Sequence, residues 1–305
     1  MKQITLRVPA TCANVGPGYD IFAMTYSNPF DEISITLNDS SKISISTRGD
    51  SQNIPLEVEN NSAGLAVRHL LDSKNIQSGV NICIKKSMTS GGGLGTTGAS
   101  AAAGIFGLNK LLSLKLTNNE MIDFARMGEV ASGGSPHADN VAAALLGGFV
   151  LVKSYKPIDV IKLNIPDFPI VLAILTKSQR TTRGFISYDI GEVKLKEQIA
   201  HCSTVIHAIH TKNIELFGEA ISKDFVAEPV RGAAIPEYSL VKQKVLQSGA
   251  FGCNISGGGS SIFAICEQQK QDEIKEIMKK LLKDNPNFIS VIKTKTSNVG
   301  IREIT

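Results

Sequence analysis

The sequence lacks the features that mark disulfide-rich, zinc-binding and membrane-spanning proteins. Its five cysteines are odd in number and none forms a Cys-X-X-Cys pair, which argues against a disulfide framework or a zinc site. No apolar run approaches the ~20 residues of a membrane span, and the first residues contain none long enough for a signal peptide. We therefore expect a cytoplasmic protein with no membrane partner.

An excess of charge of one sign is also missing. Lys and Arg total 32 and Asp and Glu total 28, a formal net charge of +4 over 305 residues. No basic cluster with interleaved aromatic residues occurs, so we expect no nucleic-acid partner. The hydrophobic content of 42% and the charged content of 20% are typical of a globular protein, and the length allows two domains with cores of their own.

Glycine, by contrast, is concentrated in loops, and the most informative loop covers residues 90–98. Residues 80–85 alternate as in a strand, and residues 101–108 are small and apolar, as in a buried helix. Glycine lets backbone N–H groups approach a ligand, and a helix N-terminus adds unpaired N–H groups, so this series predicts a phosphate site. A loop that needs small residues only for packing is the alternative. The predicted phosphate-binding residues are Gly91, Gly92, Gly93, Leu94, Gly95, Thr96, Thr97 and Gly98.

Two familiar types of phosphate loop fit this stretch poorly. A Walker loop needs Gly-Lys followed by Ser or Thr, and the sequence has no Gly-Lys pair. A dinucleotide fingerprint is formally present at residues 93–98, but its acidic residue would fall near Glu120. Residues 117–120 there indicate a capping box that opens a helix. A nicotinamide-dependent oxidoreductase is therefore the weaker alternative.

Polar residues gather in a loop near the start of the chain. Asn14 and Asp20 lie between glycine and proline residues, after a strand that we expect Pro9 to end. Such a loop often carries a site. Ordinary turn chemistry accounts for the same residues equally well.

A second glycine loop is flanked by ionisable and amide side chains. Glu129 precedes it, and His137, Asp139 and Asn140 follow it, just before an apolar helix. Such a junction is a candidate site, although Asp139 or Asn140 could simply cap the helix. A third glycine loop, at residues 251–264, leads into a strand.

The remaining pattern predicts two domains, residues 1–155 and residues 156–305. Residues 32–37 and 42–47 alternate strictly around a polar turn and predict a hairpin. A long helix is expected over residues 194–210, with its histidines at or near the surface. Residues 227–231 are expected to form a polar loop.

Together these loops resemble the motifs of the GHMP kinase superfamily over almost the whole chain. Residues 8–20 look like its first motif, residues 93–97 like its ATP loop and residues 252–259 like its third motif. The run His137-Ala138-Asp139-Asn140-Val141, which begins eight residues after Glu129, is similar to the branch that phosphorylates L-homoserine. Arg183 and Arg231 match the substrate arginines of that branch.

The resemblance implies an α+β fold of two lobes with the active site in the cleft between them. It also implies an enzyme that uses ATP and Mg²⁺, transfers the γ-phosphoryl of ATP to the side-chain hydroxyl of L-homoserine, and forms a homodimer. The family likeness assigns Asn61 and Lys86 to the nucleotide, and Mg²⁺ to Thr96 or Thr97 together with Glu129.

The acceptor site is implied in the same way. Asp20 would pair with the ammonium of the acceptor, and Arg183 and Arg231 would hold its carboxylate. Asn14, His137, Asp139 and Asn140 complete the substrate-binding residues. Asn140, Glu129 and Thr97 are the expected catalytic residues, and because Asn140 stands where some relatives have a catalytic aspartate, transfer would proceed without a dedicated base.

The sequence also departs from the family pattern. Thr96 and Thr97 replace two serines, the usual proline before the ATP loop is absent, Ser260 replaces a common proline, and Cys12 replaces a common serine. A GHMP kinase with another small hydroxylated acceptor, and a non-catalytic ATP- or amino-acid-binding regulator, are therefore the remaining alternatives.

Overall fold

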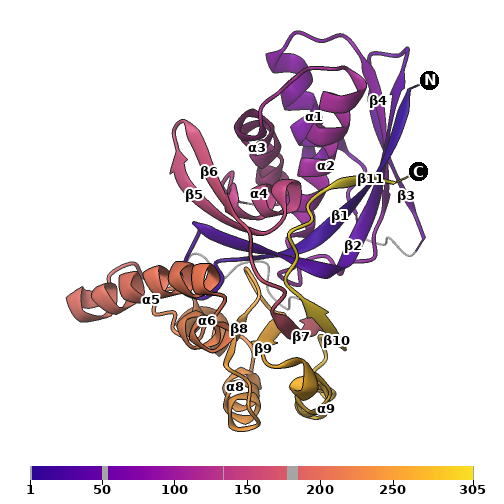
Figure 1. Cartoon of the computed structure of the whole chain (residues 1–305). Helices are drawn as coiled ribbons and strands as arrows, with labels where there is room; N and C mark the ends of the chain where they lie inside the picture. The colour runs from indigo at the N-terminus through magenta and orange to yellow at the C-terminus, as the bar shows by residue number, and fades with distance from the viewer. Residues whose placement is uncertain (1, 50–53, 133, 177–184, 305) are drawn as a thin grey trace.

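The computed structural model describes residues 2–49, 54–132, 134–176 and 185–304, so Arg183 lies outside the described residues. Two antiparallel-rich sheets, each covered by helices, form the two lobes of the molecule (Figure 1). The five cysteines are all free. Among the described residues, no helix is both long and apolar enough to cross a membrane.

The first lobe is built on a seven-stranded sheet with helices packed on one of its faces (Figure 1). Its path runs β11-β1-β2-β4-β3, and β5 pairs with both β2 and β6. The strands are β1 Gln3–Ala13, β2 Phe22–Asn38, β3 Ile43–Arg48, β4 Gly79–Lys85, β5 Phe149–Tyr155, β6 Ile158–Leu163 and β11 Arg302–Ile304. The helices are η1 Val58–Asn60, α1 Ser62–Ser73, α2 Thr96–Leu111, α3 Asn118–Arg126, η2 Met127–Ser132 and α4 Asp139–Leu146.

The second lobe has a four-stranded sheet in the order β10-β7-β9-β8. Its strands are β7 Pro169–Leu175, β8 Gly252–Ile255, β9 Ile262–Ile265 and β10 Phe288–Lys295. Its helices are α5 Gly191–Thr211, α6 Ile214–Ile221, α7 Glu228–Ala233, α8 Tyr238–Gln247, η4 Gln268–Lys270 and α9 Gln271–Leu282. The bounds of α5 confirm the long helix expected there.

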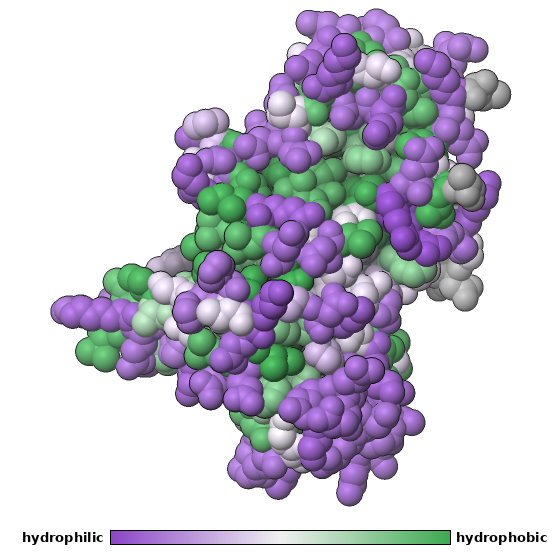
Figure 2. Space-filling model, viewed as in Figure 1, coloured by the Kyte–Doolittle hydropathy of each residue, from purple (hydrophilic) through white to green (hydrophobic). Residues whose placement is uncertain are grey.

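Strand β7 explains how the two lobes share a core. Its side chains alternate between faces, so Ile170 and Leu172 join the large core that continues into the first lobe, whereas Val171 and Ala173 join a separate core under α8 and α9. A strand buried on both faces is apolar throughout. Figure 2 shows apolar residues across the middle of this view, where the lobes meet, and hydrophilic residues over the outer ends.

The predicted hairpin is wrong. β3 does not pair with β2; it lies parallel to β4, with Ile43 opposite Val80, so β4 separates the two strands. Alternation identifies a strand but not its neighbour. Helix α1 lies between β3 and β4 in the chain and supplies the crossover that a parallel pair needs.

Two further expectations need correction. Pro9 does not end the first strand: β1 continues to Ala13 after a shift in its register with β2 between Pro9 and Thr11. Residues 227–231 are not a loop, because α7 begins at Glu228 with Pro229 in its first turn, where a missing N–H costs nothing. The capping box at Thr117 is confirmed, with Glu120 as its partner.

The observed strand pairing bears on where the boundary between the two domains falls. β6 follows residue 155 yet pairs with β5 in the first sheet, and β11 returns to that sheet at the end of the chain. We therefore propose that the division falls between β6 and β7, with the last strand belonging to the first lobe.

Candidate active site

The glycine loop lies against the third glycine loop, and its glycines are required by this packing. Gly95 caps α2 with a φ of 64°, and Gly93 has a φ of 81°, both in the left-handed region. A Cβ at Gly93 would lie 2.0 Å from the Ser256 carbonyl oxygen. Gly91 is exposed and Gly93 and Gly95 are half-buried at the start of α2, where N–H groups and the helix dipole favour an anion.

The third glycine loop holds the first in place by hydrogen bonds. The Ser256 hydroxyl donates to the Gly93 carbonyl at 2.8 Å, and the Ser261 N–H donates to the Gly92 carbonyl at 3.0 Å. Ser256 also pairs with the buried Tyr26 hydroxyl of β2 at 3.1 Å. The two loops, far apart in the chain, thus form one rigid unit at the junction of the lobes.

The same loop binds the predicted acceptor residues. Both the Asn14 side-chain amide and Arg231 Nη1 donate to the Gly257 carbonyl, at 3.1 and 2.7 Å. Asn14 has a φ of 68° and accepts the Asp20 N–H at 3.1 Å, which fixes the turn. Asn14 therefore links the first loop to the third glycine loop. Its contact with a substrate stays a prediction.

Acidic and basic side chains come together around this turn. Asp20 Oδ2 lies 3.7 Å from His137 Nδ1, so the structure brings the first loop and the loop before α4 together. Tyr19, next to Asp20, lies with its ring 5.5 Å from the Arg231 guanidinium carbon. Arg231 is buried, with 7% of the residue exposed. A carboxylate and a guanidinium that share one small region suit a zwitterionic acceptor.

Asn140 stands beside the phosphate loop. A Cβ at Gly95 would come within 2.7 Å of Asn140 Oδ1. Asp139 is 3% exposed and accepts the Asn140 N–H at 2.7 Å. Ala138 occupies the N-cap of α4 without a side-chain cap, so neither predicted residue caps this helix.

Glu129 and Thr97 meet where the metal was predicted. The Thr97 hydroxyl hydrogen-bonds the Glu129 carboxyl group. The pKa of Glu129 is raised to about 7, mainly by burial; the Thr97 hydrogen bond opposes the rise, and the charge of Asp139 contributes to it. These are hard oxygen donors of the kind Mg²⁺ prefers. Within the described residues, no group of three or more His, Cys, Asp or Glu side chains is placed to hold a metal ion.

Lys86 occupies a buried ion pair beneath the loop. Its Nζ donates to Asp31 Oδ2 at 2.7 Å and to the Thr96 carbonyl and Ser100 hydroxyl at 3.0 Å each. These bonds use all three donors of an ammonium. Asp31 is fully buried and also accepts the Ser87 N–H at 2.8 Å. Lys86 thus braces the first turn of α2, a role that no local signal in the sequence predicts.

We expect Lys86→Met to lower the free energy of unfolding by about 3–5 kcal/mol, because it leaves the Asp31 carboxylate buried without its partner. Lys85→Met is the matched control: Lys85 pairs with Glu32 at 3.0 Å on the exposed side, and its loss should cost less than about 1 kcal/mol. Urea denaturation measures both. Equal losses, or a raised KM for ATP with unchanged stability, would instead support direct nucleotide contact by Lys86.

Asn61 has a local structural role. Its side-chain oxygen accepts the N–H groups of Ala63 and Gly64, which makes it the N-cap of α1. Its side-chain amide donates to the Pro55 carbonyl at 2.8 Å. A contact with adenine therefore stays a prediction for Asn61.

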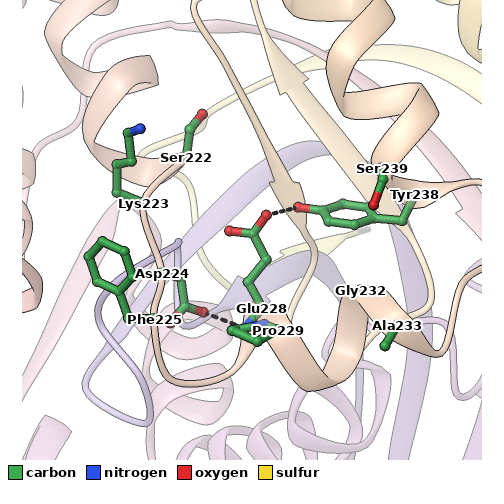
Figure 3. Close-up of a pocket in the computed structure, with 10 residues that line it drawn as sticks. All are labelled: Ser222, Lys223, Asp224, Phe225, Glu228, Pro229, Gly232, Ala233, Tyr238 and Ser239. Atoms are coloured by element: carbon green, nitrogen blue, oxygen red, sulfur yellow. Dashed lines mark hydrogen bonds between the residues drawn. The ribbon is translucent and has the colours of Figure 1, made fainter. Parts of the chain in front are cut away.

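A pocket of about 430 Å³ flanks α7, the helix that carries Arg231 (Figure 3). In it Glu228 accepts a hydrogen bond from the Tyr238 hydroxyl at 2.6 Å and from the Lys242 ammonium. Asp224 accepts the Glu228 N–H at 3.0 Å. Figure 3 shows the Glu228 carboxylate turned toward Tyr238 and the Asp224 carboxylate turned toward the Glu228 N–H. They hold α7 to α8 and to the preceding turn, and so fix the position of Arg231.

Comparison with known proteins identifies the family of this chain. The GHMP kinases N-terminal domain family matches residues 61–148, and the GHMP kinases C-terminal family matches residues 205–284. A homoserine kinase of Methanococcus vannielii is 36% identical over 283 residues, 92% of this chain and 93% of the relative. One of Thermoplasma volcanium is 31% identical over 309 residues, 99% of this chain and 97% of the relative.

Solved structures give the same result. The crystal structure of homoserine kinase from Cytophaga hutchinsonii superposes with a TM-score of 0.90 at 34% identity, covering 100% of this chain and 98% of that one. A mevalonate kinase of L. major, at 15% identity and a TM-score of 0.69, shares the fold alone. The chain therefore belongs to the GHMP kinases and, within them, to the homoserine kinase family.

Proposed function

We propose that this protein transfers the γ-phosphoryl group of ATP to the side-chain hydroxyl of L-homoserine, giving O-phospho-L-homoserine for threonine biosynthesis. The observation that carries the proposal is the third glycine loop. It binds the phosphate loop through Gly93 and the predicted acceptor residues Asn14 and Arg231 through Gly257. Phosphoryl transfer depends on holding donor and acceptor together, and this loop would connect the two predicted binding sites.

On the nucleotide side, the backbone of residues 91–95 and the N-terminus of α2 would hold the phosphates of ATP. Thr97 or Thr96, with Glu129, would hold Mg²⁺, which neutralises charge on the phosphates when bound. The donors fit this ion, because a hydroxyl and a carboxyl group lie in contact. Lys86 keeps the first turn of α2 in position for both.

On the acceptor side, Arg231 would bind the carboxylate of L-homoserine, together with Arg183. Asp20, with His137 beside it, would bind the ammonium group. Asn140 lies beside the phosphate loop and would donate a hydrogen bond to the reacting oxygen atoms. An amide cannot remove a proton at neutral pH, so transfer would proceed by positioning and charge stabilisation.

The direct test is ADP release with Mg²⁺ and ATP against L-homoserine, L-threonine, L-serine, mevalonate and shikimate. Selective turnover of L-homoserine is expected. Turnover of another alcohol would support the nucleotide site but contradict the roles proposed for Asp20 and Arg231. ATP binding without any turnover would favour the regulator alternative.

Two parts of the proposal rest on the family resemblance alone, namely the homodimer and the cytoplasmic location. Light scattering on the purified chain tests the first, and a mass of twice 32.6 kDa is expected. A monomer at working concentrations would remove the homodimer from the proposal without affecting the reaction.

A further inference from the structure

The Thr11 hydroxyl is buried beside the site. Thr11 is 0% exposed and lies in β1 just after the register shift with β2. Its N–H donates to the Leu94 carbonyl at 3.0 Å, so β1 runs directly against the phosphate loop. Its hydroxyl donates to Asn140 Oδ1 at 2.8 Å.

This hydrogen bond lies directly against Gly95 and Gly98, at the start of α2. A Cβ at Gly95 would lie 1.9 Å from Thr11 Oγ1, and a Cβ at Gly98 would lie 3.1 Å from Asn140 Cβ. Three elements, β1, α2 and α4, therefore meet at one contact. The Thr11 hydroxyl and the Asn140 amide therefore both lie against the first turn of α2.

We propose that Thr11 is a positioning residue that sets the orientation of the Asn140 side-chain amide, an inference that rests on the proposed function. Among the described residues, Asn140 Oδ1 is the acceptor of the Thr11 hydroxyl. Turning the amide over would deprive a buried hydroxyl proton of its acceptor, which is unfavourable.

The fixed orientation has a chemical consequence. With Oδ1 turned to Thr11, the other branch of the planar amide is Nδ2, which only donates. Asn140 is half-buried, and its Nδ2 makes no hydrogen bond to the rest of the described chain. This nitrogen is therefore held ready to donate to the phosphoryl oxygens or to the acceptor oxygen, where charge develops during transfer. Thr11 acts on the reaction only through Asn140.

The test compares Thr11→Val with Thr25→Val. Thr25 is equally buried and donates to the Ala143 carbonyl of the same helix at 2.9 Å, but it does not contact Asn140. Thr11→Val should lower kcat about 10- to 100-fold with the KM of ATP and of the acceptor changed less than about twofold. Thr25→Val should cost stability alone, and Thr11→Ser should restore most of kcat. Equal effects of both valine variants on kcat would overturn the proposal.

A double-mutant cycle sharpens this test. In an Asn140→Ala background no amide remains to be oriented, so Thr11→Val should lower kcat by less than about twofold further. A purely structural role for Thr11 would give the same factor in both backgrounds, and that result would overturn the proposal.

A measurement without any acceptor separates this inference from the proposed function. The side-chain ¹⁵N–H₂ signals of Asn140, identified by their absence in Asn140→Ala, should shift or broaden in Thr11→Val and stay unchanged in Thr25→Val. Unchanged signals in Thr11→Val overturn the positioning role whatever the substrate is. Changed signals together with no turnover of L-homoserine would instead count against the proposed function.

Discussion

Glu129→Gln is expected to lower kcat by about 10³-fold, since a neutral amide is a much poorer ligand for Mg²⁺ than a carboxylate. The variant should bind Mg²⁺ more weakly while leaving the fold intact. Steady-state kinetics over a range of Mg²⁺ concentrations measure both effects. The Thr97 hydroxyl can still hydrogen-bond the amide, so the local contact is retained.

The same substitution should stabilise the protein above neutral pH. The Glu129 pKa is about 7 in the folded chain, against about 4.5 for an ordinary glutamate. Between those values the folded state keeps a proton that the unfolded chain has released, so the contribution of this carboxyl to stability falls as pH rises from about 4.5 to about 7. Glutamine has no such titration. We expect Glu129→Gln to be more stable than the wild type by on the order of 2–3 kcal/mol at pH 8 and nearly equal at pH 4.5.

Thermal and urea denaturation at both pH values measure this difference. Glu276→Gln, the same change at an exposed position of α9, is the control and should alter neither activity nor the pH dependence of stability. Unchanged kcat in Glu129→Gln would remove Glu129 from the metal site. Equal stability of variant and wild type at pH 8 would mean that burial does not hold this carboxyl protonated.

Arg231→Lys is expected to lower kcat/KM for L-homoserine by about 10²-fold, with the KM of ATP nearly unchanged. Arginine binds a carboxylate with two parallel N–H groups, and an ammonium cannot reproduce this geometry. A charged hydrogen bond is worth about 1.5–3 kcal/mol, which corresponds to this loss. Steady-state kinetics with each substrate varied in turn check the prediction.

A substrate without the carboxylate provides the control. With 3-aminopropan-1-ol, which lacks only that group, wild type and Arg231→Lys should differ by less than about twofold, since the arginine has nothing to bind. Arg302→Lys, at an exposed position of β11, should match the wild type with both substrates. If Arg231→Lys raises the KM of ATP as much as that of L-homoserine, then its bond to the Gly257 carbonyl, rather than substrate contact, is its main role.

Local patterns predicted individual elements well, because a strand or a cap depends on residues close in the chain. The capping box at Thr117, the long helix α5 and the strand before the glycine loop follow from such signals. The pairing of β3 with β4 does not, because alternation is the same whichever strand lies alongside. The extent of β1 through Pro9 was also missed, since a proline is tolerated at an irregularity in the pairing.

In the candidate site, the sequence determined which chemical groups are available, namely glycine backbone, hydroxyls, a carboxylate near a helix start and an arginine after Glu228. It did so because those groups depend on residue type. Only the tertiary structure decided which of them meet. Lys86 forms a buried ion pair with Asp31. Asn140 accepts a hydrogen bond from Thr11, 129 residues away in the chain. Such contacts depend on how β1, α2 and α4 pack, and packing across long separations leaves no local pattern in the chain.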